Sequence, residues 1–217
     1  MAFKTGKLSE GNPDVLAQGA EAKIFLDKNK GKIIKERIKK GYRINEIDSK
    51  IRKQRTRAEK KLLLKASQII NCPKPLENQD EYKIEIPYIK GKKLSESLDS
   101  FSLEKQKKIC NEIGKMIAKL HENNIIHGDL TTSNMIFLEK ENKVFFIDFG
   151  LGFFSDKIED KAVDLHLLRQ ALETRHFKNA EELFEQIIKG YEIYSKSKQV
   201  MERFERVDKR GRYKGSY

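Results

Sequence analysis

One polar segment and one Asp-Phe-Gly triplet do most to constrain the fold of this chain of 217 residues. The segment is His127-Gly-Asp-Leu-Thr-Thr-Ser-Asn134, and the triplet is Asp148-Phe-Gly150. Between them lie two apolar runs joined by the four-residue turn Glu139–Asn142, which predicts a β-hairpin. Because the two ends of a hairpin lie side by side, we expect Asn134 and Asp148 to be close together.

The residue types in these two segments suit phosphoryl transfer. That reaction needs charge neutralised around the transferred group and a carboxylate near the attacking oxygen. Asp129 would orient or deprotonate the acceptor oxygen, while Asn134 and Asp148 offer the hard oxygen ligands that suit Mg²⁺ bridging the phosphates of ATP. Each residue alone is equally explained as a turn or strand-end residue. Their order and spacing together favour the chemical interpretation.

In order and spacing, the two segments resemble the catalytic loop and the metal-binding motif of the protein-kinase superfamily. The resemblance implies an α+β, minimal bilobal protein-kinase-like fold. A small N-terminal β-sheet lobe would carry one long helix, and the C-terminal lobe would be compact and mainly helical. We expect a single kinase-like domain over residues 1–217, divided into an N-terminal lobe (1–86), a hinge (87–91), a C-terminal lobe (92–205) and a basic tail (206–217).

Hydrophobic periodicity supports this division. Alternating apolar runs and turn signals predict three strands within residues 14–38, and strand-like sequence recurs at 83–89. Apolar residues at helical spacing predict a long basic helix over 44–70 and a second helix that begins after Ser102 as N-cap and runs to His121. The remainder, from 162 to 204, is typical of two or three helices.

Two charged residues upstream of the motif match nucleotide-binding positions of kinases. Lys35, at the end of the third predicted strand, resembles the lysine that contacts the α- and β-phosphates, and Glu59 would be its ion-pair partner. The alternatives are one more surface lysine in a lysine-rich segment, and an intrahelical ion pair for Glu59.

The expected phosphate loop and hinge are inferred by position. The segment Gln18–Ala22 contains one glycine where kinases have three, so a turn that directs backbone N–H groups at phosphate and an ordinary strand-to-strand turn both explain it. In the hinge, Pro87 keeps its carbonyl group and Ile89 its N–H group, and both suit the adenine edge. The predicted ATP-binding residues are therefore Gln18, Gly19, Ala20, Glu21, Ala22, Lys35, Glu59, Pro87 and Ile89.

Other features distinguish the chain from peptide-directed kinases. Gly128 stands where kinases switched by activation-loop phosphorylation have an arginine, so we do not expect that control. Only fifteen residues separate Asp148 from Asp164, with no Ala-Pro-Glu sequence, so a normal peptide-docking platform is not expected. Asp164 resembles the buried kinase aspartate that braces the catalytic loop, although a helix-start residue is equally consistent with the sequence.

Composition limits the compartment and the partners. Charged residues in the first thirty positions do not fit a signal peptide, and no apolar run is long enough for a membrane span. The two cysteines, Cys72 and Cys110, lack metal-site spacing and are expected to be reduced thiols of a cytoplasmic protein.

Between Lys28 and Lys65 there are sixteen basic and four acidic residues, a local excess equal to the net charge of +12. Such a band is typical of a solvated helix face or of a surface that attracts a polyanion.

Three short sequence motifs indicate one family within the protein-kinase superfamily. The sequences Arg55-Thr-Arg-Ala-Glu59 and Thr131-Thr-Ser-Asn134, with the basic end Arg206–Lys214, resemble the small kinase/ATPase subunit of the KEOPS complex, the PRPK-like atypical Ser/Thr kinases, over nearly the whole chain. The resemblance implies ATP and Mg²⁺ as cofactors, autophosphorylation, and an ATPase role in threonylcarbamoyl modification of adenosine in tRNA. It also implies three partners, namely a Kae-type threonylcarbamoyl-transferring subunit, a Cgi-type small subunit and tRNA bound by the basic band and tail.

Three other interpretations remain at this point. A small-molecule phosphotransferase also uses His-Gly-Asp but normally adds a larger helical region than the 53 residues after Asp164. A RIO-type ribosome-assembly kinase shares the compactness and the basicity. A pseudokinase scaffold would bind partners only, although it would have no chemical need for the complete set of kinase-like residues.

Overall fold

The computed structural model describes the backbone of residues 14–212 and the side chains up to residue 209. Contacts divide the chain into two compact units. One contains the chain up to Lys60 together with Lys74–Tyr88, and the other contains Lys61–Pro73 together with the chain from Ile89 onward. The chain therefore passes from the first unit to the second for the last time between Tyr88 and Ile89, inside the segment predicted as the hinge.

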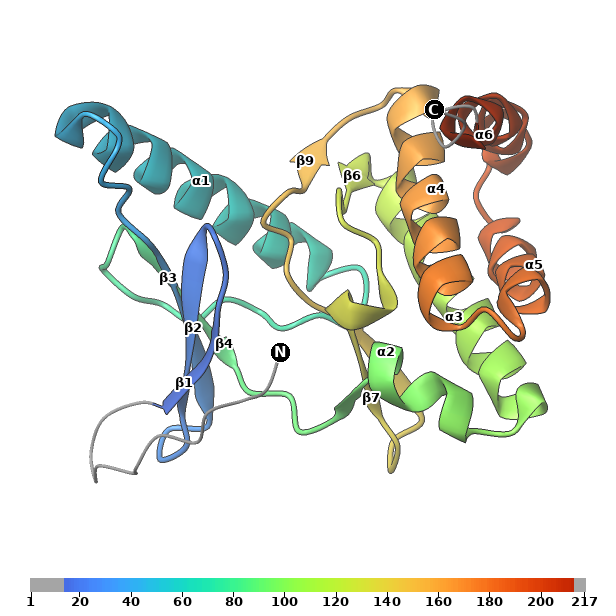
Figure 1. The fold of residues 1–217 in the computed structure, drawn as a ribbon, viewed down its shortest axis with the longest axis horizontal. Coiled ribbons are helices and arrows are strands. Elements are labelled where there is room, and N and C mark those ends of the chain that lie inside the picture. The colour runs from blue at the N-terminus through green and yellow to red at the C-terminus, as the bar shows by residue number, and fades with distance from the viewer. Residues whose placement is uncertain (1–13, 213–217) are drawn as a thin grey trace. The chain divides into compact units, whose positions relative to one another are not determined.

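The first unit is built on an antiparallel sheet of four strands in the order β1-β2-β3-β4 (Figure 1). The turn between β2 and β3 is closed by Asp27, whose carboxylate accepts a hydrogen bond from the Lys30 N–H group at 3.0 Å, and by Gly31 at a positive φ of 59°. The three strands predicted within residues 14–38 are confirmed. The strands are β1 (Asp14–Gln18), β2 (Ala22–Asp27), β3 (Lys32–Arg37) and β4 (Lys83–Pro87).

Helix α1 (Asn45–Ala66) is the predicted long basic helix. Its first turn is fixed by the buried Asp48 carboxylate, which accepts hydrogen bonds from Arg52 Nε (2.7 Å) and from the Lys40 N–H group (3.2 Å). The helix ends at Ala66 and not at residue 70, because the next residues turn back and the amides of Ile69 and Ile70 both bond to the Ala66 carbonyl at 2.9 Å.

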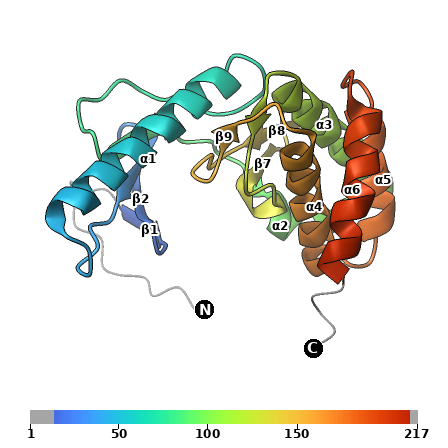
Figure 2. The ribbon, with the colours of Figure 1, turned by 90° about the horizontal axis from the view of Figure 1, so that it is seen from above.

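The second unit is mainly helical. Helix α3 (Leu103–Glu122) begins as predicted, with the Ser102 hydroxyl accepting from the Lys105 N–H group. Figure 2 shows α3 beside α5 and α4 beside α6, pairings that the backbone contacts support. The other helices are α2 (Leu94–Ser97), the 3₁₀ turn η1 (Leu98–Ser100), α4 (Ile158–Arg175), α5 (Ala180–Tyr191) and α6 (Ser197–Arg212).

Helices α3 and α5 approach each other closely at two glycines. A Cβ atom on Gly114 would lie 2.0 Å from the Ile187 carbonyl oxygen, and one on Gly190 would lie 2.1 Å from the Asn111 carbonyl oxygen. Both distances are far below van der Waals contact, so only glycine permits this packing. The backbones of the two helices are therefore in direct contact at these two positions.

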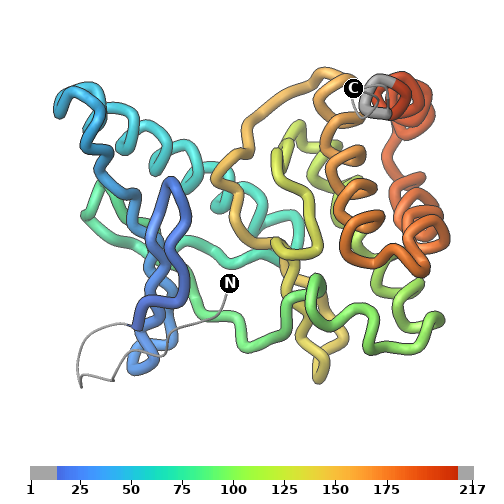
Figure 3. The backbone as a smooth tube through the Cα atoms, viewed as in Figure 1, coloured from blue at the N-terminus to red at the C-terminus, as the bar shows by residue number. Residues whose placement is uncertain are grey.

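Short strands hold the polar segments identified in the sequence. Strand β6 (Ile125–Ile126) pairs with β9 (Phe153–Phe154), and the intervening chain, seen as a tube in Figure 3, carries both segments. The predicted hairpin is confirmed as β7 (Met135–Leu138) and β8 (Lys143–Phe146), with β5 (Lys92–Lys93) at the edge of the same sheet. The 3₁₀ turn η2 (Thr132–Asn134) leads into this hairpin.

The end of the described chain continues α6 into the segment predicted as a basic tail. Val207 and Asp208 are buried, and Asp208 lies 3.4 Å from Arg169 on α4. Residues 213–217 lie outside the described part.

No helix within residues 14–212 combines the length and the apolar character that a membrane crossing requires. Both cysteines, Cys72 and Cys110, are buried free thiols, as predicted.

Candidate active site

The amide of Asn134 ties the two halves of the polar segment together. Its Nδ2 donates to the Asp129 carboxylate oxygen Oδ2 at 2.8 Å and to the Asp129 carbonyl oxygen at 2.9 Å. The Ile147 N–H group donates to the Asn134 carbonyl oxygen at 2.9 Å, which places the residue preceding Asp148 against Asn134. The hairpin therefore brings together the three oxygen-bearing residues predicted from the motif, namely Asp129, Asn134 and Asp148.

Asp148 adopts a strained backbone conformation. Its φ is 62°, in the left-handed region that costs most non-glycine residues free energy, although aspartate tolerates it better than most. Its Oδ1 accepts a hydrogen bond from the Gly150 N–H group at 3.1 Å, which stabilises the turn. Strain of this kind concentrates at functional sites because the surrounding structure has to maintain it.

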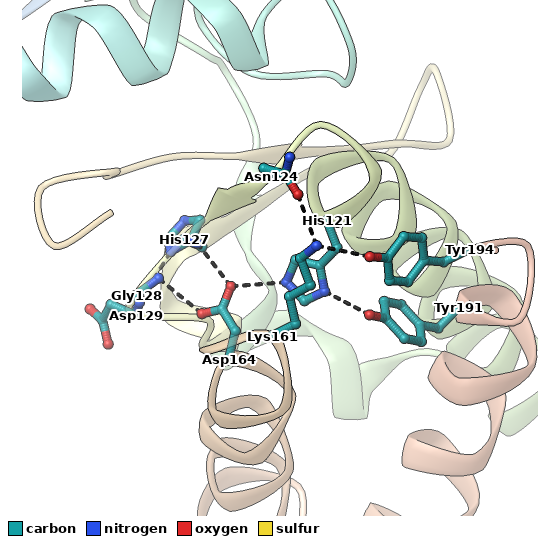
Figure 4. A network of polar contacts seen from close by, with 9 residues as sticks. All are labelled: His121, Asn124, His127, Gly128, Asp129, Lys161, Asp164, Tyr191 and Tyr194. Atoms are coloured by element: carbon teal, nitrogen blue, oxygen red, sulfur yellow. Dashed lines mark hydrogen bonds and ion pairs between the residues drawn. The ribbon is translucent and has the colours of Figure 1, made fainter. Parts of the chain in front are cut away.

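Asp164 on α4 holds the start of the polar segment (Figure 4). Its Oδ2 accepts from the His127 N–H group at 2.8 Å, and its Oδ1 accepts from the Gly128 N–H group at 2.9 Å. Asp164 is 1% exposed and lies within the helix, six residues after its first residue Ile158, so it is not a helix-start residue. The bracing interaction that the kinase resemblance implied is present.

Gly128 is required by the backbone of this segment. Its φ is 78°, and a Cβ atom there would lie 2.3 Å from the Leu151 carbonyl oxygen. An arginine at this position would meet both obstacles. The glycine found in place of the kinase arginine is therefore part of the local geometry of this loop.

A buried polar network extends from Asp164 through α3 to the end of α5 (Figure 4). His121 lies between Asp164, 3.3 Å from its Nε2, and the Tyr191 hydroxyl, 2.8 Å from its Nδ1. Because the Asp164 carboxylate only accepts, Nε2 carries the proton and Nδ1 accepts from Tyr191. Nearby, Lys161 donates to Asn124 Oδ1 at 3.0 Å and to the Tyr194 hydroxyl at 2.8 Å.

Burial changes the ionisation of this network. Desolvation lowers the pKa of His121 and of His127 below the usual value of 6.5, against the opposing attraction of Asp164. Desolvation also lowers the pKa of Lys161, and it raises the pKa of the Tyr191 hydroxyl. The two histidines are therefore held neutral in the folded protein near pH 7.

The first unit contains the predicted Lys35–Glu59 pair. Lys35 Nζ lies 2.7 Å from Glu59 Oε1, and the Glu59 side chain is 1% exposed. The second carboxylate oxygen of Glu59 accepts from Arg37 Nη2 at 2.6 Å. The pair joins strand β3 to helix α1, so the intrahelical alternative for Glu59 is wrong. Lys35 has a buried carboxylate as its partner.

The predicted phosphate loop is a tight turn between β1 and β2. The Gly19 N–H group donates to the Ala22 carbonyl oxygen at 2.9 Å, and Lys40 contacts the Ala20 carbonyl oxygen. Glu21, one of the predicted ATP-binding residues, pairs with Arg55 on α1 at 2.6 Å. Of the remaining predicted ATP-binding residues, Gln18 ends β1, Pro87 ends β4, and Ile89 begins the last segment of the second unit.

Four participating residues were not identified from the sequence. Arg37 could have been found because it lies two residues after Lys35 on one strand, so the two side chains share a face. His121 and Lys161 lie within helices, where a lone polar residue gives no signal of its partners. The fourth is His176, which contacts Thr132 in the polar segment His127–Asn134.

Comparison with known proteins decides the family. The protein kinase domain family model matches residues 14–196. The KEOPS complex subunit Bud32 of Pyrococcus abyssi is 46% identical, over 92% of this chain and 96% of that protein. The chain belongs to the Bud32 family of protein kinases. The Bud32 assignment confirms the resemblance drawn from the residues.

Longer relatives of the Bud32 family and one solved structure complete the comparison. The probable bifunctional tRNA threonylcarbamoyladenosine biosynthesis proteins of Methanococcus vannielii and Methanobrevibacter smithii are 41% and 42% identical, over 92% and 93% of this chain. This chain spans only 36% and 37% of their length. The Rio2 kinase of Chaetomium thermophilum matches with a TM-score of 0.56 at 16% identity, covering 90% of this chain and 70% of that chain, which confirms the protein-kinase-like fold.

Proposed function

We propose that this Bud32-family protein is an ATP-dependent atypical Ser/Thr kinase and ATPase that acts as a subunit of the KEOPS complex in the threonylcarbamoyl modification of tRNA. The observation that carries the proposal is the double hydrogen bond from Asn134 to Asp129, on a hairpin whose other end is Asp148. This arrangement supports the proposal, because a carboxylate for the attacking oxygen would lie beside oxygen atoms that would bind a metal. Phosphoryl transfer needs both.

The donor set fits Mg²⁺. Because Asn134 Nδ2 faces Asp129, its amide oxygen Oδ1 is the atom left for a metal, and a carboxylate at Asp148 adds the charged oxygen that Mg²⁺ prefers. Within residues 14–212 there is no cluster of three or more His, Cys, Asp and Glu side chains, so substrate phosphates would supply further ligands. Bound Mg²⁺ would neutralise the charge that develops on the phosphates.

The chain's own residues would then have three roles. Asp129, with its carboxylate oriented by Asn134, would accept a hydrogen bond from the attacking water or hydroxyl and take up its proton as the bond to the γ-phosphorus forms and the bond to ADP breaks. Lys35, oriented by Glu59, would contact the α- and β-phosphates. The turn formed by Gln18, Gly19, Ala20, Glu21 and Ala22 would direct its unbonded backbone N–H groups at the phosphates, while the Gly19 N–H group closes the turn on Ala22. The Pro87 carbonyl group and the Ile89 N–H group would contact the adenine.

The partners are proposed from the relatives. The bifunctional relatives are described as tRNA threonylcarbamoyladenosine biosynthesis proteins, and the Pyrococcus abyssi relative is described as a KEOPS complex subunit. Their descriptions support a Kae-type threonylcarbamoyl-transferring subunit as one partner and a Cgi-type small subunit as a second. The exposed cations Lys50 and Arg57 of the basic band, with the basic C-terminal end, would bind tRNA in the cytoplasm.

ATP turnover by the purified protein with Mg²⁺, alone and with the Kae-type partner and tRNA, tests the proposal. Asp129→Asn and Asp148→Asn are the controls, because each preserves side-chain volume and removes a charge. We expect partner-stimulated phosphate release that both substitutions abolish. Release that survives both substitutions, or none under any condition, would favour a binding scaffold. Phosphate transferred to serine or threonine, measured in the same samples, separates kinase from ATPase output.

A further inference from the structure

His176 connects three parts of the second unit that are distant in sequence. It follows the last residue of α4, where its N–H group donates to the Leu172 carbonyl oxygen at 2.7 Å, and it is 2% exposed. Its Nδ1 lies 2.8 Å from Asp99 Oδ1 in η1, and its Nε2 lies 3.0 Å from Thr132 Oγ1 in the catalytic segment. These partners are 77 and 44 residues away along the chain.

The chemistry of the partners gives the contacts a direction. An ionised carboxylate can only accept a hydrogen bond, so Nδ1 of His176 carries a proton and donates it to Asp99. In the neutral ring, Nε2 then has a lone pair and accepts from the Thr132 hydroxyl. The chain of hydrogen bonds therefore runs from Thr132 through His176 to Asp99, and the buried Thr132, 1% exposed, has its hydroxyl satisfied by the histidine.

Thr132 is well placed to affect the candidate active site. It is the first residue of η2, the turn that ends at Asn134, whose N–H group donates to the Thr131 carbonyl oxygen at 3.0 Å. Asn134 in turn holds the Asp129 carboxylate. A displacement of the Thr132 side chain would therefore move the turn that fixes both residues.

Helix α4 and the residue that follows it contact the catalytic segment at two points. Asp164 in the helix accepts from the backbone of His127 and Gly128, and His176 at the helix terminus accepts from Thr132. The first contact fixes where the segment begins, and the second fixes where it turns into the hairpin. Because both anchors belong to one helix, their separation is set by the helix itself.

We propose that His176 is a positioning residue of the catalytic loop, oriented by Asp99 and acting through the hydroxyl of Thr132 on the turn that carries Asn134. The proposal rests on the proposed function, since the residues it positions are the candidate acid–base and metal-binding groups. Asp164 holds only the backbone of His127 and Gly128, at the start of the segment. His176 adds a hydrogen bond to Thr132, close to the end of the segment at Asn134.

Two conservative variants of Thr132 test the hydrogen bond between Thr132 and His176 with little risk to folding. Thr132→Val removes the hydroxyl and leaves Nε2 of His176 buried without its donor, whereas Thr132→Ser keeps the hydroxyl. We expect Thr132→Val to lower kcat for ATP turnover by about tenfold to a hundredfold, with the KM for ATP within about twofold of wild type, and Thr132→Ser to restore most of the loss. Thr174→Val is the matched control, because the exposed Thr174 hydroxyl bonds within α4 to Gln170.

Two measurements test the link without relying on turnover. In ¹⁵N NMR of labelled histidines at about pH 8.5, where neutral rings dominate, His176 should show the Nδ1–H tautomer. His121 and His127 should show Nε2–H, because the Nε2 atom of His121 faces Asp164 and that of His127 lies 3.1 Å from the Ile147 carbonyl oxygen. A His176→Gln variant assigns the signal. Amide hydrogen exchange over residues 127–134 should accelerate in Thr132→Val and not in Thr132→Ser or Thr174→Val.

The outcomes separate this proposal from the proposed function. An Nε2–H tautomer for His176, or wild-type exchange in Thr132→Val, would overturn the positioning link even in an active enzyme. So would an unchanged kcat in Thr132→Val. If the wild type shows no ATP turnover, the proposed function fails, and the tautomer and the exchange rates alone still support or overturn the link.

Discussion

The Asn134 side chain donates two hydrogen bonds to Asp129, one to the carboxylate at 2.8 Å and one to the backbone carbonyl oxygen at 2.9 Å. A single amide thus fixes both the position of the Asp129 backbone and the direction of its carboxylate. The same amide presents its oxygen on the side away from Asp129. Under the proposed function, the orientation of the acid–base group and the binding of the metal would therefore both depend on this one residue.

Substitution of Asn134 should impair both roles together. Asn134→Ala removes the amide oxygen and both hydrogen bonds to Asp129, so we expect kcat for ATP turnover to fall by about a hundredfold or more and the Mg²⁺ concentration for half-maximal rate to rise. Initial rates over a Mg²⁺ titration measure both. Asn71→Ala, at an exposed asparagine of the same unit, should leave both unchanged. A loss of rate in Asn134→Ala with no change in Mg²⁺ dependence would argue against metal binding by this amide.

Arg37 should contribute strongly to the stability of the fold, because it forms a buried ion pair with Glu59. It is 5% exposed and pairs with Glu59, which is also buried, so removing the arginine leaves one carboxylate oxygen without its charged partner. We expect Arg37→Gln to lower the free energy of unfolding by roughly 3 kcal/mol, measured by urea denaturation.

Arg55 provides the control for this prediction. Its pair with Glu21 has nearly the same N–O distance, 2.6 Å, but the two side chains are 46% and 48% exposed. Solvent screens such pairs, so Arg55→Gln should cost about 0.5 kcal/mol. Equal losses for the two variants would contradict the assignment of the stabilisation to burial.

Stability should depend on pH through the buried histidines. Burial lowers the pKa of His121 below its unfolded value of 6.5, so the unfolded state binds the proton more readily. The stabilising contribution is complete above about pH 6.5 and is lost as the pH falls through and below that value. We expect the free energy of unfolding to decrease between about pH 7.5 and 5.5, by at most about 1.4 kcal/mol per pH unit for each such histidine.

A His121→Asn variant isolates this contribution. It removes the titrating group, so its unfolding free energy should fall less steeply than that of the wild type over the same pH range. The slope that remains would come mainly from His127, whose pKa burial lowers in the same direction. A slope equal to that of the wild type would show that His121 does not supply the linkage.

Local sequence signals were enough to predict the central part of the candidate site. Asp129, Asn134 and Asp148 lie in one motif and one hairpin, so their proximity follows from short-range geometry. The strands of the first unit and the helix after Ser102 were likewise predicted from periodicity and capping, and the structure confirms them.

The contacts that hold the site could not be predicted in the same way. Asp99 and Thr132 meet at His176 only because η1, η2 and the end of α4 converge in three dimensions. A single sequence contains no signal of that convergence, and a lone histidine at a helix end has many ordinary explanations. The kinase resemblance did indicate Asp164, because the family pattern already includes its long-range contact.

Close packing of α3 against α5 gives a final prediction. A methyl group on Gly190 would lie 2.1 Å from the backbone oxygen of Asn111, so Gly190→Ala must separate the two helices. Overpacking of this kind costs roughly 1–3 kcal/mol, and the usual preference of a helix for alanine over glycine offsets about 1 kcal/mol of that cost. We expect a lower free energy of unfolding for this variant in urea denaturation.

Gly41→Ala is the matched control, because a Cβ atom at Gly41 meets nothing within 4 Å and its φ is not positive. The added methyl group should leave stability unchanged or raise it by up to about 1 kcal/mol, since it restricts only the unfolded chain. The separated helices should also loosen the Tyr191 contact with His121, because Tyr191 directly follows Gly190. Gly190→Ala should therefore accelerate amide exchange at the end of α3, and a variant as stable as Gly41→Ala would contradict the glycine-dependent approach of the two helices.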